Sequence, residues 1–218
     1  MLFSKEKLQL LLAEFLGTAL LCVVVLRVSH VFGLGTAAWY TSLSAGLALA
    51  LIVALFGRFS GAHVNPAITI GLWTLKKIDA ATAIVFVSTQ MLAGASTLLL
   101  YDYLTGQKLV MSGSSTFSGR VFIAEMIGSL IFGVGVAMAA TRELKEGFAS
   151  FVIGVSLAIG ALVASLAAPG FLNPAVALAN NAWDKTVIIA PIVGIAVGMN
   201  LYYYAFEGDD KIRSERDR

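Results

Sequence analysis

The feature that most constrains this chain is an Asn-Pro-Ala stretch that occurs twice, as Asn65-Pro66-Ala67 and as Asn173-Pro174-Ala175. A proline disfavours the helical conformation in the residue before it, so neither Asn is expected inside a helix. Asn is nevertheless a preferred N-cap, and proline has the backbone geometry of the first helical position. Each stretch therefore predicts a loop that ends abruptly at the N-terminus of a helix.

The rest of the chain has the composition of a membrane protein. Its residues are 58% hydrophobic and only 13% charged, whereas soluble domains have about 25% charged residues. The charges are separated by uncharged runs that are long enough to cross a bilayer as helices. Six such runs are predicted, at 8–26, 37–56, 80–101, 121–140, 148–168 and 187–206. The composition therefore predicts an all-α, multi-pass membrane protein.

Two shorter apolar segments begin at the Asn-Pro-Ala stretches. The first, 67–75, is followed directly by Lys76 and Lys77. A helix of that length covers only about 14 Å, roughly half of the hydrocarbon core. The second segment extends to about residue 182. We expect both segments to be re-entrant half-helices.

The two halves of the chain resemble each other. Glu14 and Glu125 each lie in an Ala-Glu-x-x-Gly pattern, and each half has an Asn-Pro-Ala stretch between its second and third runs. Because each half crosses the membrane three times, the second half must be inverted, and such repeats place their site near the midplane. We expect one channel domain at 1–206, with repeats at about 8–101 and 121–206, and a charged cytoplasmic tail at 207–218.

The Lys and Arg residues predict the orientation in the membrane. If the N-terminus is cytoplasmic, eleven of the fifteen Lys and Arg residues lie on the cytoplasmic side. The positive-inside rule therefore favours a cytoplasmic location for both termini. We expect the protein to lie in the cell membrane.

The point where the two half-helices meet would repel cations. Each helix N-terminus carries roughly +0.5 of an elementary charge, and two of them facing a narrow path form a positive barrier. The side-chain oxygen of each Asn can cap its own helix, which leaves the NH₂ group to donate to a passing molecule. This arrangement predicts a passive pore for water or small neutral solutes, with Asn65 and Asn173 at its centre.

Four other polar residues lie close to this centre in the repeat pattern. Glu14 and Glu125 lie within apolar runs, where carboxylates suggest a proton relay. Their symmetric positions favour another role, in which they accept hydrogen bonds from the backbone of the re-entrant loops. Gln90 is expected to brace a loop as well. His63 is expected to line the path, and gating through its titration is the alternative.

At these residues the chain is similar to the aquaporin, or major intrinsic protein, family. The resemblance covers roughly residues 8–206. It rests on the two Asn-Pro-Ala stretches with their neighbours (residues 63–67 and 173–175), both Ala-Glu-x-x-Gly patterns, Gln90 with Gly94, and the Pro-Ile-Val-Gly segment at residues 191–194. It implies six tilted helices plus two half-helices, a pore in each subunit, and a homotetramer in membrane lipid. No cofactor, metal or nucleic-acid partner is expected.

One position departs from the family pattern. Family members usually have Arg directly after the second Asn-Pro-Ala, where it forms a selectivity filter with three other positions; this chain has Val176. Counted without gaps, the other three positions are Ala45, Ala161 and Gly170. Four small or apolar residues predict either a wide ring that admits glycerol, urea or peroxide, or an apolar ring that dewets. Our working hypothesis is the wide, weakly selective pore.

Two other classes of protein remain open. A secondary transporter also uses inverted repeats, but it would need coupling carboxylates near the midplane, and only Glu14 and Glu125 qualify. A poorly conducting membrane scaffold would account for the missing Arg. An enzyme is not expected, because the sequence has no recognisable nucleophile–base pair, metal cluster or phosphate-binding loop.

Overall fold

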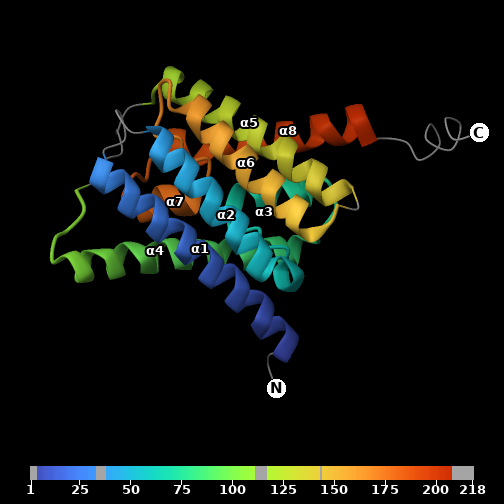
Figure 1. Ribbon diagram of the computed structural model, residues 1–218, viewed down its shortest axis with the longest axis horizontal. Coiled ribbons are helices and arrows are strands. Elements are labelled where there is room, and N and C mark those ends of the chain that lie inside the picture. The colour runs from blue at the N-terminus through green and yellow to red at the C-terminus, as the bar shows by residue number, and fades with distance from the viewer. Residues whose placement is uncertain (1–3, 33–37, 111–116, 143, 208–218) are drawn as a thin grey trace, which may run out of the picture.

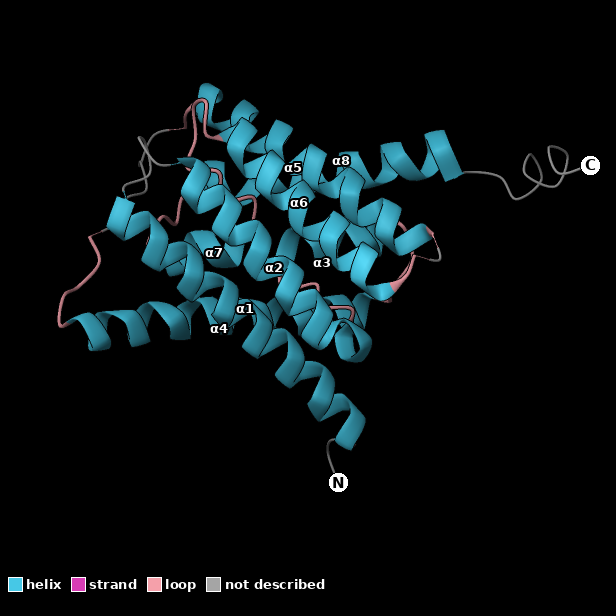
Figure 2. Ribbon diagram, viewed as in Figure 1, coloured by secondary structure: helices cyan, strands magenta, loops and turns pink. Residues whose placement is uncertain are grey.

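The computed structural model describes residues 4–32, 38–110, 117–142 and 144–207. These residues form eight α-helices and one π-helix, with no strand among them (Figures 1 and 2). The elements are α1 (Lys5–Phe32), α2 (Ala38–Ser60), α3 (Pro66–Thr74), α4 (Ala80–Thr105), α5 (Gly119–Thr141), α6 (Glu146–Ala164), α7 (Pro174–Ala179), α8 (Lys185–Tyr202) and η1 (Tyr203–Glu207). The predicted tail, from residue 208 onwards, lies outside the described residues.

Six of these helices are long and apolar enough to cross a membrane: α1, α2, α4, α5, α6 and the continuous α8–η1 segment. The remaining two, α3 and α7, have nine and six residues and begin at the two Asn-Pro-Ala stretches. The prediction of an all-α membrane protein with six crossings is therefore confirmed.

The second half-helix ends earlier than its apolar pattern predicted. It stops at Ala179 rather than near residue 182, because Asn181 adopts a left-handed conformation with φ of 50°. The Ala182 N–H donates to the Ala177 carbonyl at 3.0 Å, which closes a Schellman-type C-terminus. Similarly, α6 ends at Ala164 rather than near 168. Hydropathy alone could not detect the end of α6, because Leu166, Ala167 and Ala168 continue the apolar pattern past it.

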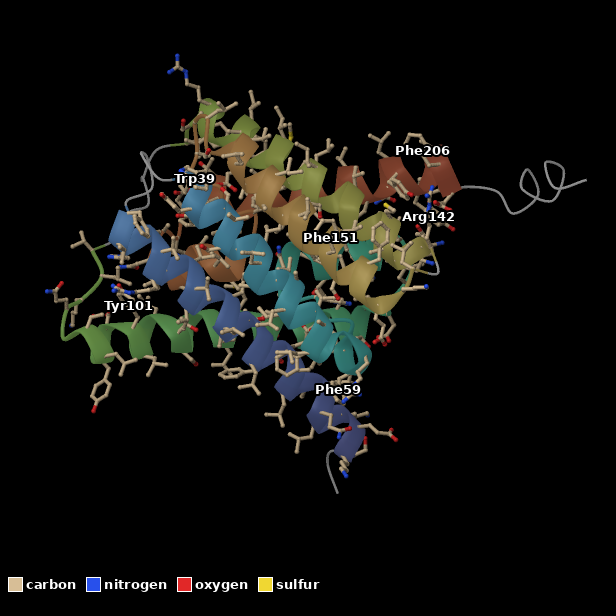
Figure 3. The ribbon with its side chains drawn as sticks, in the orientation of Figure 1. Trp39, Phe59, Tyr101, Arg142, Phe151 and Phe206 are labelled. Carbon is tan, nitrogen blue, oxygen red and sulfur yellow. The ribbon has the colours of Figure 1, made fainter. Side chains whose placement is uncertain are left out.

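Both chain ends of the described helices lie on one side of the bundle. We call this side, where α1 begins and η1 ends, the terminal face, and the opposite side the distal face (Figure 1). Apolar side chains project from the outer surface of the helices, as expected for contact with lipid (Figure 3). Trp39 and Tyr101 lie towards the distal face, and Phe59 and Phe206 lie towards the terminal face. Two such aromatic bands are typical of membrane–water interfaces.

The membrane-crossing helices approach each other closely at glycines. A Cβ atom added to Gly46 of α2 would lie 2.5 Å from the Gly154 carbonyl oxygen of α6. One added to Gly128 of α5 would lie 2.3 Å from the Gly160 carbonyl oxygen, also on α6. Lipid provides no hydrophobic force between helices, so close van der Waals packing at small residues must hold them together.

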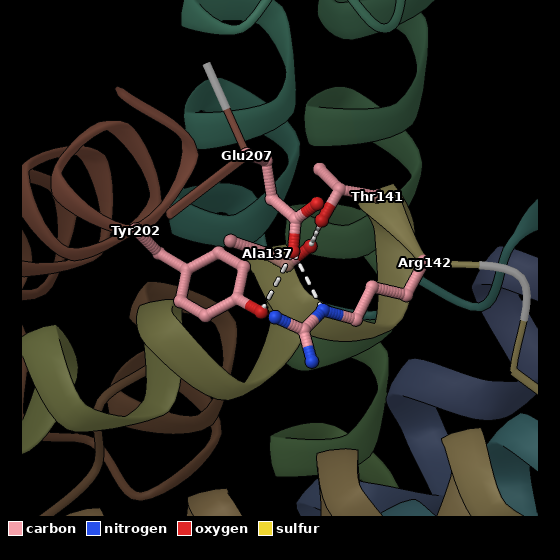
Figure 4. A network of polar contacts seen from close by, with 5 residues as sticks. All are labelled: Ala137, Thr141, Arg142, Tyr202 and Glu207. Carbon is pink, nitrogen blue, oxygen red and sulfur yellow. Dashed lines mark hydrogen bonds and ion pairs between the residues drawn. The ribbon is translucent and has the colours of Figure 1, made fainter. Parts of the chain in front are cut away.

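A polar network joins α5 to η1 at the terminal face (Figure 4). Arg142, which follows α5, forms an ion pair with Glu207 of η1, with 2.6 Å between Nε and Oε1. The Tyr202 hydroxyl donates to the same oxygen at 3.1 Å. The network joins the last turn of the sixth crossing helix to the end of the fourth, and the Arg142 side chain of the pair is partly exposed to solvent.

Candidate functional site

The two Asn residues cap the half-helices as their sequence context predicts. The backbone at Asn65 and Asn173 is extended, and proline occupies the first helical position after each. The Asn65 side-chain oxygen accepts from the Ala67 N–H at 2.9 Å, and the Asn173 oxygen accepts from the Ala175 N–H at 2.9 Å. Each Asn thus satisfies part of the first turn of its own half-helix.

The same two Asn residues also join the two loops to each other. The Asn65 amide donates to the Leu172 carbonyl at 2.9 Å, and the Asn173 amide donates to the Val64 carbonyl at 2.9 Å. These reciprocal bonds bring the N-termini of α3 and α7 face to face. They also modify the sequence-based expectation, because only one of the two amide hydrogens remains available on each Asn. That hydrogen has no partner among the described residues.

The loops before the two Asn residues have an unusual backbone. Ala62, Val64 and Leu172 have φ values of 47°, 42° and 50°, and Gly170 has φ of 73°. Positive φ is uncommon outside glycine and is a clear outlier for a β-branched residue such as Val64. Left-handed residues in a loop can turn neighbouring N–H groups towards one side, which forms a concave anion site. Here the anions are two carboxylates of the protein itself.

Glu14 of α1 fills the first of these concavities. Its Oε1 accepts from the Ser60 hydroxyl at 2.7 Å and the His63 N–H at 2.9 Å. Its Oε2 accepts from the Val64 N–H at 2.8 Å and the Gln90 amide at 2.7 Å. The carboxylate is fully buried and holds the first loop to both α1 and α4.

Glu125 of α5 occupies the equivalent place in the second half. It accepts from the N–H groups of Gly170, Phe171 and Leu172 at 2.8, 3.0 and 3.0 Å. The position that corresponds to Gln90 is Gly194, where a Cβ atom would lie 2.3 Å from a backbone oxygen of α5. The second loop is therefore held by backbone bonds and close helix packing, without a side chain from α8.

A narrow cavity of about 20 Å³ lies between the Asn pair and the distal face. By the usual measure a cavity needs roughly 10–15 Å³ to hold a water molecule, so this one accommodates about one. Its walls are formed by Leu21, Val25, Thr41, Ser42, Ala45, Leu49, His63, Val64, Asn65, Phe132, Leu157, Ala161, Pro169, Gly170, Phe171, Asn173 and Val176. All four predicted filter residues, both Asn residues and His63 belong to this one set.

A larger cavity of about 430 Å³ lies on the terminal side of the narrow one. Arg58, Lys77 and Glu146 are the charged residues on its wall. Leu49, His63 and Phe132 line both cavities. These three residues, which we call the junction, therefore stand where the two cavities adjoin.

One stripe of α2 runs along both cavities. Its members are Thr41, Ala45, Leu49, Val53 and Gly57, which are spaced by four residues and so share one helix face. The stripe continues the predicted position of Ala45 in both directions. Both cavities therefore lie along the same face of α2.

Several wall residues were not predicted from the sequence. Thr41 and Leu49 would have followed from Ala45 by helical spacing. Phe132 follows Glu125 by seven residues, as Leu21 follows Glu14, and both line the narrow cavity.

The remaining predicted residues lie behind the route rather than on it. Pro66, Ala67, Pro174 and Ala175 are buried in the first turns of α3 and α7, and Glu14, Glu125 and Gln90 bind the loops from behind; none of these seven lines either cavity. The His63 ring contacts the Thr69 hydroxyl at 3.2 Å through Nδ1 and the Phe86 ring at 5.1 Å between centroids. These contacts fix the ring at the junction.

The narrowness of the distal cavity differs from the wide ring that four small residues suggested. The reason lies beside those residues in the sequence. Gly46 follows Ala45 and Gly160 precedes Ala161, and both glycines lie in close helix crossings. A Cβ atom on Gly170 would lie only 2.7 Å from the Ala161 carbonyl. Small side chains here let the helices and the loop come closer, so they do not widen the route.

Comparisons with known proteins agree with this architecture. A model of the family described as "Major intrinsic protein" matches residues 1–203. Aquaporin Z of Photorhabdus laumondii is 29% identical over 226 residues, which cover 91% of this chain and 98% of that protein. Aquaporin AqpM of Methanothermobacter thermautotrophicus is 27% identical over 183 residues, which cover 74% of each chain.

A solved structure shows the same fold. The X-ray structure of the aquaglyceroporin from Plasmodium falciparum superposes with a TM-score of 0.69, at 20% sequence identity, over 96% of this chain and 98% of the other. At that identity the likeness concerns the fold alone. The family match over nearly the whole chain, together with the six crossings and two facing half-helices, leads to one conclusion: the chain belongs to the major intrinsic protein family, whose members are passive membrane channels for water and small solutes.

Proposed function

We propose that the narrow cavity, the junction and the larger cavity form one conduction path, along which water and small neutral solutes pass without coupling to an ion. The observation that carries this proposal is the continuous α2 stripe that lines both cavities and passes the Asn65–Asn173 pair. Each Asn retains one amide hydrogen that can donate to the oxygen of a solute. Asn65 and Asn173 are thus the pore centre.

Charge selection is assigned to the half-helices. No Asp, Glu, Lys or Arg lines the narrow cavity in the described part of the chain. The facing N-termini of α3 and α7 each contribute roughly +0.5 of an elementary charge. A cation in this cavity would meet two positive ends and no compensating carboxylate, because Glu14 and Glu125 line neither cavity and accept hydrogen bonds from groups behind the path. Their burial away from the path supports a channel over an ion-coupled transporter.

Size selection is assigned to two places in series. Ala45, Ala161, Gly170 and Val176 form the distal filter, which is apolar and narrow because the helices that carry it are close together. The junction follows, with the bulky Phe132 side chain on its wall. Both places favour molecules close to the width of water over branched or larger solutes.

The terminal face is assigned to the cytoplasm and the distal face to the outside, on the basis of the Lys and Arg distribution. The protein is placed in the cell membrane as a homotetramer with one path in each subunit, as the family resemblance implies.

Stopped-flow permeability of reconstituted vesicles tests the path. Wild-type vesicles should shrink in an osmotic gradient faster than empty vesicles. Ala45→Phe should remove most of that difference, because the new ring enters the narrow cavity. Leu47→Phe is the matched control, since Leu47 lies on the same helix but is 64% exposed on the outer surface. If wild-type and empty vesicles respond equally to both water and glycerol, the conducting role is wrong.

Val176→Arg tests the filter positions separately. A long cationic side chain at this wall position should lower glycerol permeability more than water permeability. Unchanged water, glycerol, urea and peroxide ratios would mean that the filter residues are placed incorrectly, even if the channel conducts.

A further inference from the structure

The narrow cavity contains a polar group that the family pattern does not account for. Thr41 is 8% exposed, and its hydroxyl oxygen has no hydrogen-bond partner among the residues that the structure describes. Three other buried hydroxyls share this property, those of Thr18, Thr97 and Ser129. None of these three lines a cavity described here, whereas Thr41 lines the narrow one.

The position of Thr41 on α2 places its side chain on the helix face that lines the path. It precedes Ala45 by one helical turn, and Ala45 precedes Leu49 by another, so the three residues share the cavity-lining face. Thr41 is the most distal of the three. A solute that enters from the distal side passes Thr41 before it reaches the filter and the Asn pair.

The other polar side chains of the narrow cavity already have partners. The Ser42 hydroxyl donates to the Ala38 carbonyl at 2.8 Å, within its own helix. Asn65 and Asn173 bond each other's loops at the centre, and His63 contacts Thr69 on the terminal side. Among the described residues that line the distal half of the cavity, Thr41 is therefore the one whose side-chain hydroxyl makes no hydrogen bond.

A buried hydroxyl without a partner is unfavourable unless a molecule in the cavity supplies one. We propose that the Thr41 hydroxyl is the hydrogen-bond partner of the solute in the distal half of the path, one helical turn outside the apolar filter. This inference rests on the proposed channel function. It places polar recognition at Thr41 and size exclusion at the filter, instead of combining both at one ring.

The chemistry of this hydroxyl defines the solute class. A threonine hydroxyl donates one hydrogen bond and accepts two, and it carries no charge. It can therefore bind water, alcohol hydroxyls and amide groups equally well, and it gives no advantage to an anion or a cation. The preferred solutes are neutral molecules that carry O–H or N–H groups and are narrow enough for the filter that follows.

Thr41→Val tests the proposal, because valine has nearly the same shape but no hydroxyl. Loss of one ordinary hydrogen bond at the barrier should reduce water permeability per protein by about 2- to 12-fold. Thr41→Ser should retain most of the wild-type rate, because it keeps the hydroxyl. Thr97→Val is the matched control: Thr97 is 2% exposed and its hydroxyl is also unpartnered, but it lies on α4 away from both cavities, so its permeability should be unchanged.

The outcomes separate this inference from the channel function itself. If wild-type vesicles conduct and Thr41→Val conducts equally well, the inference is wrong and the channel function stands. If Thr97→Val or Thr41→Ser loses as much permeability as Thr41→Val, a packing defect explains the loss and the inference is also wrong. If wild-type vesicles do not conduct at all, the channel function fails. Should Thr41→Val not reach the membrane, Thr41→Ala is measured in its place and is expected to lose at least as much permeability.

Discussion

The close crossing of α2 and α6 keeps the distal filter narrow, and two glycines of α2 offer a direct test. An alanine at Gly46 would place its Cβ atom 2.5 Å from the Gly154 carbonyl oxygen and 2.7 Å from the Ala158 Cβ atom. An alanine at Gly57 would meet only the Val53 side chain, at an ordinary 3.5 Å. The same chemical change in one helix should therefore have opposite effects on stability.

The expected difference follows from these distances. At Gly46 the neighbouring backbone must move by roughly 0.9 Å to reach the ordinary contact distance of 3.4 Å, and it cannot rotate away as a side chain would. Overpacking of this kind costs about 1–3 kcal/mol. The better helix propensity of alanine recovers about 0.5–1 kcal/mol at either position. Gly46→Ala should thus be destabilised by about 0.5–2 kcal/mol, and Gly57→Ala should be stabilised by about 0.5–1 kcal/mol.

Thermal unfolding in detergent, followed by intrinsic fluorescence, measures this difference. A free-energy gap of about 1–3 kcal/mol should separate the two unfolding temperatures by about 3–10 °C, with wild type between them. Gly46→Ala should also raise the ratio of glycerol to water permeability, because it separates the helices that carry Ala45 and Ala161. An unfolding temperature of Gly46→Ala equal to or above that of Gly57→Ala would refute the close crossing.

Two further predictions concern the helix caps. Asn65→Asp keeps the capping oxygen but places a second oxygen against the Leu172 carbonyl, to which the Asn65 amide donates at 2.9 Å. The free energy of unfolding should therefore fall by about 1–3 kcal/mol. Asn173→Asp should show the same decrease in the same melting experiment. Asp79 caps α4, and hydrogen bonds from the first turn of that helix hold the pKa of its carboxylate below the ordinary 3.8. Its contribution is therefore present at neutral pH and disappears as pH falls through the lowered pKa. Asp79→Ala should melt below wild type at pH 7, and the difference between the two unfolding temperatures should shrink as pH is lowered below 3.8. A difference that stays constant with pH would exclude this cause.

Local steric rules made much of this fold predictable. The Asn-Pro dipeptide disfavours helix at the Asn and is well suited to begin a helix at the Pro, so the starts of α3 and α7 were expected from four residues. The positions of Glu14 and Glu125 indicated the loop contacts that the structure contains, because a buried carboxylate needs donors and a re-entrant loop has unpaired N–H groups. Both predictions needed only a few neighbouring residues or the similarity between the two halves of the chain.

The width of the path was less accessible from the sequence, because it depends on how far apart the helices lie. Ala45, Ala161, Gly170 and Val176 line the same narrow cavity, yet their small size suggested a wide opening. The glycine beside each alanine reverses that effect, since it lets the backbone of the neighbouring helix move inwards. Pore width therefore depends on pairs of adjacent residues: one residue faces the solute, and its neighbour sets the helix separation.

The same reasoning relates the missing Arg to the rest of the path. A channel with Arg at the position of Val176 would combine a positive charge, a hydrogen-bond donor and a steric limit in one side chain. In the proposed path, the charge barrier falls to the facing half-helices, and the steric limit falls to close helix packing and the junction, which Phe132 lines. The remaining component, a hydrogen-bond partner on the distal side, is available at Thr41. Because these components lie on separate residues, substitutions should alter one kind of selectivity at a time: Thr41→Val the rate for polar solutes, and Gly46→Ala the size limit.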